Sequence, residues 1–245
     1  MKGHGLLEGR RVLVTAAAGT GIGFATAQRC AAEGATVVVS DKHERRLGEA
    51  AEQLGAAVAA AVPCDVTVQA DVDRLFAEAG ELDVVVNNAG LGGTALLTEM
   101  TDEQWAVVLD VTLTGTFRCT RAALQRMLPR GAGVIVNNAS VLGWRAQAGQ
   151  AHYAAAKAGV MALTRCAAVE AAPHGVRVNA VAPSLAMHPF LSKVMSEEAL
   201  ADLERQEAFG RSATPEEVAN VIVFLASDYS SYMTGEVVSV SSQHP

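Results

Sequence analysis

Residues 11–41, RVLVTAAAGTGIGFATAQRCAAEGATVVVSD, decide the fold of this 245-residue chain. The apolar run 11–15 predicts a short buried strand, and residues 16–23 predict a tight glycine-rich turn into a helix that ends near Gly34. A second apolar run, 36–40, predicts another buried strand. A strand, a helix and a strand in this order indicate parallel pairing in a sheet that helices cover on both faces.

The same alternation continues towards the carboxyl end, and no linker, internal repeat or low-complexity tract interrupts it. We therefore expect one α/β domain, a Rossmann-type doubly wound parallel sheet of about seven strands. Within residues 1–245, the dinucleotide-binding part is expected at about 1–130 and the catalytic and substrate part at about 131–245. The further strands are expected at residues 57–62, 82–86, 133–136, 175–181 and 236–240.

The composition excludes several classes of protein. The net charge is −7 and no basic tract is present, which argues against nucleic acid or an anionic membrane as a partner. The four cysteines form no CxxC pair, and no apolar run suits a signal peptide or a membrane span, so we expect a cytoplasmic protein with reduced thiols. The six histidines lack the spacing of metal ligands, so no metal is expected.

The turn after the first strand is a candidate phosphate site. Gly19, Gly21 and Gly23 form a G-x-G-x-G pattern, in which backbone N–H groups and a helix N-terminus can meet a pyrophosphate. Such a turn is weak evidence alone, because any tight strand-to-helix turn uses glycine. Asp41 strengthens it, since a carboxylate at the end of the second strand suits the adenosine ribose hydroxyls.

Asp41 also bears on the choice of cofactor. Its negative charge would repel the 2′-phosphate of NADP, so the electrostatics favour NAD. Lys42, Arg45 and Arg46 follow at once and would offset that repulsion unless they form a solvated helix face. NADP therefore remains a second possibility.

Residues 133–157, GVIVNNASVLGWRAQAGQAHYAAAK, hold the candidate chemistry. Tyr153 and Lys157 are four residues apart and share one face of a helix, where an ammonium would lower the pKa of a phenol. Ser140, at the end of the preceding strand, could share a substrate oxygen with that phenol. Each residue alone has an ordinary structural explanation. Together on a nucleotide-binding sheet they predict proton transfer to a carbonyl or from an alcohol.

Two further groups are less specific. Residues 87–90, NNAG, end the fourth strand at the sheet edge where ligands bind in such folds, although asparagines also simply form turns. Trp144, Arg145, Met187 and Phe190 are candidates for the substrate side, although ordinary packing explains them almost as well.

These motifs resemble the short-chain dehydrogenases/reductases over essentially the full chain. The resemblance implies that Tyr153 is the general acid/base, that Ser140 orients and polarises the substrate oxygen, and that Lys157 lowers the tyrosine pKa and holds the nicotinamide ribose. It also implies a homo-oligomer, a tetramer or dimer, built by the helices after strands four and five. The cofactor contacts that it implies are Thr15, Gly19, Thr20, Gly21, Ile22, Gly23, Asp41, Asp65, Val66, Asn88, Ala89, Gly90, Tyr153, Lys157, Pro183 and His188.

The chain departs from the family pattern at several positions. Ala16 stands where the turn has its first glycine, and the turn is one residue longer. Thr112 occupies the place of the asparagine that completes the family's proton relay; a threonine can still hold a water, so Thr112 stays a catalytic candidate. His188 replaces the threonine that grips the carboxamide, and Ser241-Ser242 replaces a common Asp-Gly.

Four segments, TAAAGTGIG, SDKHERRLGE, NNASVLGWRAQ and ASDYSSYMTGEVVSVSSQ, resemble actinobacterial enzymes of sterol C/D-ring breakdown, which act on a methyl-oxo-indane ring carried as a coenzyme A thioester. This resemblance implies an NAD-dependent oxidoreductase that interconverts a secondary alcohol and a ketone on a bulky alicyclic, steroid-derived CoA thioester in cholesterol degradation. An NADP-dependent 3-oxoacyl thioester reductase is the alternative. A dinucleotide-binding protein without turnover is a third reading, suggested by Thr112 and His188.

Overall fold

The computed structural model describes residues 3–187 and 197–242, and their core is one seven-stranded sheet in the order β3-β2-β1-β4-β5-β6-β7. All six pairings are parallel. The predicted α/β class and doubly wound sheet are confirmed. The strands are β1 (Arg11–Thr15), β2 (Thr36–Asp41), β3 (Val58–Pro63), β4 (Val84–Asn87), β5 (Gly133–Asn138), β6 (Val176–Pro183) and β7 (Val237–Val240).

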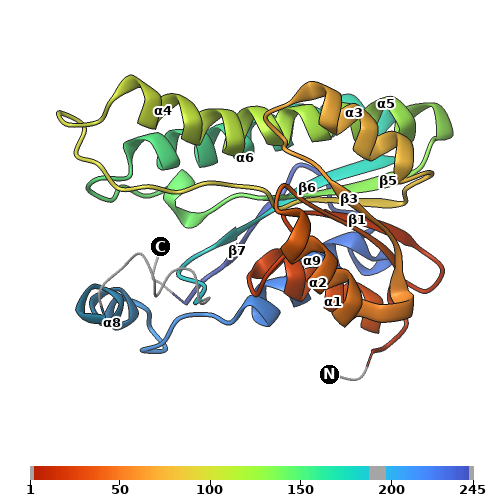
Figure 1. Ribbon diagram of the computed structural model, residues 1–245, viewed down its shortest axis with the longest axis horizontal. Coiled ribbons are helices and arrows are strands. Elements are labelled where there is room, and N and C mark those ends of the chain that lie inside the picture. Colours follow the sequence, from red (N-terminus) through yellow and green to blue (C-terminus); the bar gives the residue numbers. More distant parts are fainter. Residues whose placement is uncertain (1–2, 188–196, 243–245) are drawn as a thin grey trace.

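Helices cover both faces of the sheet (Figure 1). On one face lie α1 (Ile22–Ala32), α2 (Glu44–Leu54) and α9 (Pro215–Ala226); on the other lie α3 (Gln69–Glu78), α4 (Asp102–Leu109), α5 (Gly115–Arg130) and α6 (Ala151–Ala171). A further helix in the described part of the chain, α8 (Glu197–Gln206), precedes Glu207, whose Oε2 accepts a hydrogen bond of 2.9 Å from Ser242 beyond β7. Short turns of helix are η1 (Gly55–Ala57), η2 (Asp110–Thr114), η3 (Val141–Gly143), η4 (Ala172–His174) and η5 (Asp228–Ser230).

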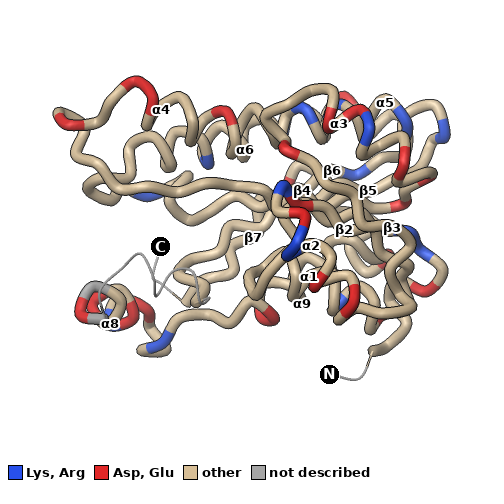
Figure 2. The backbone as a smooth tube through the Cα atoms, in the orientation of Figure 1, with Lys and Arg blue, Asp and Glu red and all other residues tan. Residues whose placement is uncertain are grey.

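The strands are apolar on both faces because each face packs against its own helical layer. Leu13 and Val85 belong to the core under α3, α5 and α6, whereas Val12, Val14 and Val86 belong to the core under α1 and α9. Each fully buried side chain of this size contributes about 1.5–3 kcal/mol through the hydrophobic effect. Figure 2 shows the complementary pattern, in which charged residues lie mainly on the helices and loops and the sheet is largely uncharged.

The strand order indicates which edge of the sheet binds ligands. The chain builds β1, β2 and β3 in one direction and then returns to add β4 on the other side of β1, so β1 and β4 flank the point where the order reverses. Ligands of such sheets bind at this point, beyond the carboxyl ends of the strands. No helix among the described residues is long and apolar enough to span a bilayer.

One helix differs from expectation. The sequence suggests a single helix from Thr101 to about Leu128, and the capping box of Thr101 with Gln104 is present as expected. The structure inserts a π-helical turn, η2, between α4 and α5, and α5 continues past Pro129 to Arg130. Such wide turns depend on side-chain contacts across the molecule, which the helical period does not reveal.

Candidate active site

The carboxyl ends of β1 and β4 are joined through the Thr15 hydroxyl. Thr15 is buried, and its Oγ1 accepts hydrogen bonds from the backbone N–H groups of Asn88 (3.0 Å) and Ala89 (3.1 Å). The side chain of Asn88 completes the junction, because its Nδ2 donates to the carbonyl oxygens of Thr15 (3.2 Å) and Ala16 (3.1 Å). The predicted glycine turn and the predicted NNAG loop therefore form one structure.

This junction leaves no space for a side chain at Gly23. A Cβ added there would lie 2.2 Å from the Ala16 carbonyl oxygen and 2.5 Å from the Asn88 Nδ2. Ala16, at the position where the family has glycine, has a φ of 50°. That left-handed conformation costs a residue with a Cβ roughly 1–2 kcal/mol.

The outer side of the turn fits the pyrophosphate of a dinucleotide. A Cβ added at Gly19 or Gly21 would meet no protein atom within 4 Å, so the backbone is open to a ligand on this side. Gly21 is the N-cap of α1, and the first turn of α1 carries no acidic residue, so its positive end is not neutralised. Open N–H groups at a helix N-terminus are suited to phosphate.

Asp41 ends β2 beside this turn. Its Oδ2 accepts from the backbone N–H of Ala18 (3.3 Å) and its Oδ1 from that of His43 (3.0 Å), which holds the carboxylate against the glycine turn. Each oxygen keeps a second lone pair for a ribose hydroxyl. The position therefore fits the adenosine half of the cofactor.

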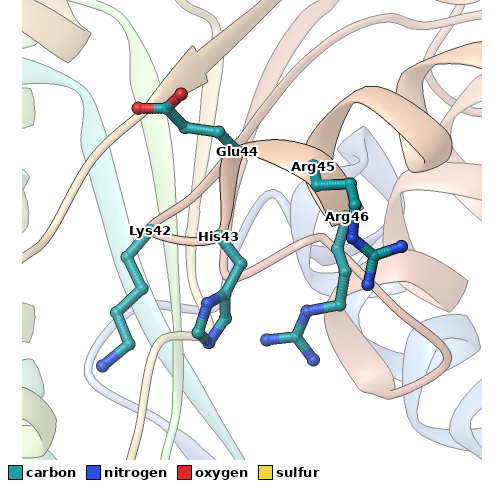
Figure 3. Close-up of a pocket in the computed structure, with 5 residues that line it drawn as sticks. All are labelled: Lys42, His43, Glu44, Arg45 and Arg46. Carbon is teal, nitrogen blue, oxygen red and sulfur yellow. The ribbon is translucent and has the colours of Figure 1, made fainter.

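A basic pocket of about 320 Å³ adjoins Asp41 between β2 and α2. In Figure 3, Lys42, His43 and Arg46 project to the same side, whereas Glu44 is turned away from them. A second cavity of about 490 Å³ continues from this pocket to Asp65. Burial raises the pKa of Asp65, but hydrogen bonds from Thr67 outweigh this and keep it below its usual value. Both an acidic and a basic feature thus border the expected adenosine site.

The structure brings Ser140, Tyr153 and Lys157 close together. Ser140 precedes η3 and is buried; a hydrogen bond joins it to the Tyr153 phenol. Lys157 lies one turn after Tyr153 in α6, with its Nζ 5.5 Å from the centre of the tyrosine ring. The same Nζ donates a hydrogen bond of 2.6 Å to the carbonyl oxygen of Asn138.

The pKa values differ from the expectation that Lys157 lowers the pKa of Tyr153. Burial raises the tyrosine pKa above its ordinary value, and the hydrogen bond from Ser140 offsets this only in part. Burial also lowers the pKa of Lys157 to about 8. The expected lowering is therefore wrong for the chain alone, because desolvation exceeds the effect of any neighbour. The phenol is protonated at neutral pH and is suited to donating a proton.

Thr112 lies in the π-helical turn η2 and is fully buried. Its Oγ1 accepts a hydrogen bond from the Leu91 N–H (3.0 Å) and donates one to the Leu91 carbonyl (3.1 Å). A Cβ added at Gly90 would lie 3.5 Å from the Lys157 Nζ and 3.8 Å from the Thr112 Oγ1. Thr112 thus fastens the loop after β4 beside the lysine, and its hydroxyl is engaged with that loop.

The remaining predicted residues are distributed as follows. Trp144 lies just after η3 and is 49% exposed. Met187 lies in the segment after β6, where its N–H donates a hydrogen bond of 3.0 Å to the Ala213 carbonyl oxygen. His188 and Phe190 lie outside the described residues. Among the residues that the structure describes, no three His, Cys, Asp or Glu side chains cluster as metal ligands. Ile22 is the first residue of α1, and the loops and strand ends around this edge hold Thr20, Val66, Ala89, Arg145 and Pro183.

Asn138 is a residue that the sequence reasoning did not single out. Its Nδ2 donates 2.9 Å to the Asn88 Oδ1, and its backbone carbonyl accepts from Lys157. The available signal was the repeated Asn-Asn dipeptide: Asn87 pairs with Asn137 in register, so each dipeptide ends one of two neighbouring strands.

Comparisons with known proteins agree with this arrangement. A family model described as enoyl-(acyl carrier protein) reductase matches residues 16–242. The chain is 65% identical to the Mycobacterium tuberculosis (5R,7aS)-5-hydroxy-7a-methyl-1-oxo-2,3,5,6,7,7a-hexahydro-1H-indene-carboxyl-CoA reductase, over 99% of this chain and 96% of the relative. It is 40% identical to the 3-oxoacyl-[acyl-carrier-protein] reductase of Thermotoga maritima, over 96% and 97% of the two chains. A crystal structure of a short chain dehydrogenase from Mycobacterium smegmatis superposes with a TM-score of 0.88 at 59% identity, covering 100% and 97% of the chains.

The close packing at Gly23 gives a test of the junction. We expect Gly23→Ala to lower the free energy of unfolding by about 2–3 kcal/mol, because the backbone oxygen of Ala16 cannot move away without breaking its bond to Asn88. Gly21→Ala is the matched control and should change it by less than about 1 kcal/mol, since a Cβ there meets no atom. Urea unfolding of both variants measures the difference, and equal stabilities would contradict the packing argument.

Proposed function

The chain belongs to the short-chain dehydrogenase/reductase family of NAD(P)-dependent oxidoreductases, and we propose that it interconverts a ketone and a secondary alcohol on a bulky alicyclic CoA thioester. The observation that carries this proposal is the cluster of Ser140, Tyr153 and Lys157 at the carboxyl edge of the sheet. The relative from M. tuberculosis, a reductase of a hydroxy-methyl-oxo-indene-carboxyl-CoA, supports a steroid-derived indane ring and a place in cholesterol degradation.

The proposed chemistry divides between cofactor and protein. The nicotinamide cofactor, when bound, supplies or accepts the hydride. In the reducing direction the Tyr153 phenol donates its proton to the substrate oxygen, and Ser140, already hydrogen-bonded to that phenol, holds the same oxygen. Because burial raises the tyrosine pKa, the proton is available throughout the neutral range. Oxidation of the alcohol requires the phenolate, whose formation the same burial opposes.

Lys157 acts on the charge that develops during the reaction. When Tyr153 gives up its proton, a phenolate forms on the neighbouring turn of α6, and a protonated Lys157 stabilises it. The bond from Nζ to the Asn138 carbonyl holds the ammonium in place. Thr112 serves this site by fixing Leu91, next to the Gly90 that adjoins the lysine.

We assign the remaining residues by their positions. Trp144, Arg145, Met187 and Phe190 are proposed for the substrate side, where the half-exposed Trp144 offers an apolar surface to an alicyclic ring. The dinucleotide-binding part is proposed at about 1–130 and the substrate part at about 131–245. The cofactor is proposed to contact Thr15, Gly19, Thr20, Gly21, Ile22, Gly23, Asp41, Asp65, Val66, Asn88, Ala89, Gly90, Tyr153, Lys157, Pro183 and His188.

NAD is the proposed cofactor. The Asp41 carboxylate is held at the end of β2 by two backbone N–H groups, so its charge cannot turn away from a 2′-phosphate. The pocket lined by Lys42, His43, Glu44, Arg45 and Arg46, in which basic residues outnumber the one carboxylate, supports the alternative, an NADP-dependent 3-oxoacyl thioester reductase. The 40% identity to the T. maritima enzyme supports it as well. The cofactor and the substrate therefore need separate tests.

A cytoplasmic homo-oligomer, a tetramer or dimer, is proposed as the working form. Large apolar side chains are exposed on the helical layer that contains α4, α5 and α6, namely Trp105, Phe117 and Val169. Their burial against another copy would be favourable. The described cysteines are all free thiols, and three of the four are buried, which supports a reducing compartment.

Replacement of Tyr153 tests the proposed function. We expect Tyr153→Phe to lower kcat by roughly 10²–10⁴-fold, because the proton donor is lost, and to change the dissociation constant for NADH little. Turnover is measured with a methyl-oxo-indane-carboxyl-CoA and with acetoacetyl-CoA. Tyr229→Phe, at an exposed tyrosine, is the control. Near-wild-type turnover by Tyr153→Phe would refute the mechanism, and preference for acetoacetyl-CoA would favour the 3-oxoacyl alternative.

The choice of cofactor follows from the charge of Asp41. We expect the wild type to bind NADH about tenfold more tightly than NADPH, and Asp41→Asn to remove most of that preference. Dissociation constants from the quenching of protein fluorescence measure both. Glu52→Gln is the matched control, since Glu52 is an exposed carboxylate on α2 that lines neither pocket. Much tighter binding of NADPH by the wild type would overturn the argument from Asp41.

The pH dependence of ketone reduction should follow Lys157. Below its pKa of about 8 the ammonium is present; as the pH rises through that value it is lost. We expect kcat/KM to be level from about pH 6 to 8 and then to fall by about tenfold per pH unit. In Lys157→Arg the charge persists at high pH, so the fall near pH 8 should disappear. An unchanged profile in that variant would assign the titration to another group.

A further inference from the structure

Asn138, at the end of β5, links the two halves of the site. Its side-chain Nδ2 donates 2.9 Å to the Asn88 Oδ1, and Asn88 in turn binds the glycine turn at Thr15 and Ala16. Its backbone carbonyl accepts the hydrogen bond of 2.6 Å from the Lys157 Nζ. A single residue therefore lies between the proposed phosphate site and the proposed catalytic lysine.

The hydrogen bonds determine which way each amide points. The carbonyl oxygens of Thr15 and Ala16 can only accept, so Asn88 must present its Nδ2 to them and its Oδ1 to the other side. That oxygen also only accepts, so Asn138 must present its Nδ2 to it. The Oδ1 of Asn138 is consequently forced to face away from Asn88.

This oxygen has no donor in the described part of the protein. The Asn138 Oδ1 is buried, and no side-chain or backbone donor among the described residues bonds to it. Buried acceptors are nearly always paired, because desolvation without a hydrogen bond is costly. The neighbouring contacts prevent the amide from rotating to relieve this cost. The oxygen is thus preset to receive a donor from a bound molecule.

We propose that the Asn138 Oδ1 accepts a hydrogen bond from a hydroxyl of the nicotinamide ribose, an assignment that rests on the proposed function. A dinucleotide that runs from the turn at Ala16 to Tyr153 and Lys157 passes Asn138, which bonds to residues at both ends of that path. A ribose hydroxyl suits the position because it can accept from the Lys157 ammonium and donate to the Asn138 Oδ1 at the same time. Asn138 is then a cofactor-binding residue.

The experiment compares three ligands and two variants. ADP lacks the second ribose, ADP-ribose contains it, and NADH adds the nicotinamide. Asn138→Leu removes both polar atoms and keeps a side chain branched at Cγ, whereas Asn138→Asp keeps an acceptor and loses the donor to Asn88. Dissociation constants by titration calorimetry, with thermal unfolding to confirm that each variant is folded, give the result without any measurement of turnover. Asn138→Ala replaces the leucine variant if that one does not fold.

We expect Asn138→Leu to raise the dissociation constants of NADH and ADP-ribose about tenfold more than that of ADP, because only the first two ligands contain the proposed donor. In Asn138→Asp the dissociation constants of all three ligands should rise by the same factor, since the acceptor remains and only the hydrogen bond to Asn88 is lost. If Asn138→Leu raised all three dissociation constants equally, or raised none, the proposal would be overturned. The Asn138 Oδ1 would then serve a bound water or the junction with Asn88 instead of the cofactor.

Two other results have distinct meanings. Weakening of NADH alone in Asn138→Leu would overturn the assignment to the ribose, because the donor would then be the nicotinamide carboxamide. Failure of the wild type to bind NADH or NADPH at all would instead refute the proposed function, before Asn138 is considered. Asn220→Leu, on α9, is the control for loss of an asparagine outside the site and should leave all three dissociation constants unchanged.

Discussion

The hydroxyl of Thr15 and the amide of Asn88 fasten the two sheet halves where the strand order reverses. These bonds hold the start of the loop after β4 against the glycine turn. The same junction leaves no space for a side chain at Gly23 and holds Ala16 in the left-handed backbone conformation. Everything proposed for the cofactor depends on this junction, because it sets where the phosphate site ends and where the catalytic side begins.

Burial governs the other half of the site. Tyr153 and Lys157 are held in a desolvated position, which opposes charge on both: the phenol keeps its proton and the ammonium gives one up more readily. A bound cofactor and substrate change this balance, since a hydrogen-bonding partner can replace the lost water. Without ligands, Tyr153 is therefore neutral, which suits proton donation in the reducing direction. Formation of the phenolate requires the interactions of bound cofactor and substrate.

Much of this could be read from the sequence, since runs of valine separated by helical periods are local signals and Tyr153 and Lys157 share a helix face by spacing alone. The π-helical turn, the two hydrogen bonds between Thr112 and Leu91 and the orientation of Asn138 could not be predicted, because each depends on residues from another strand or loop. The raised pKa of Tyr153 does not follow from the sequence for the same reason. Its neighbour on the helix was visible in the sequence, but the depth of burial was not.

The wide turn between α4 and α5 also bears on how such a site can vary. A π-helical turn holds one residue more than an α-helical turn without rotating the helix on either side. The extra residue can therefore be gained or lost while α4 and α5 keep their packing. Thr112 lies in this turn and holds Leu91 through its hydroxyl, so a change of one residue in the turn would shift the hold on the loop after β4 while the two helices stay in place.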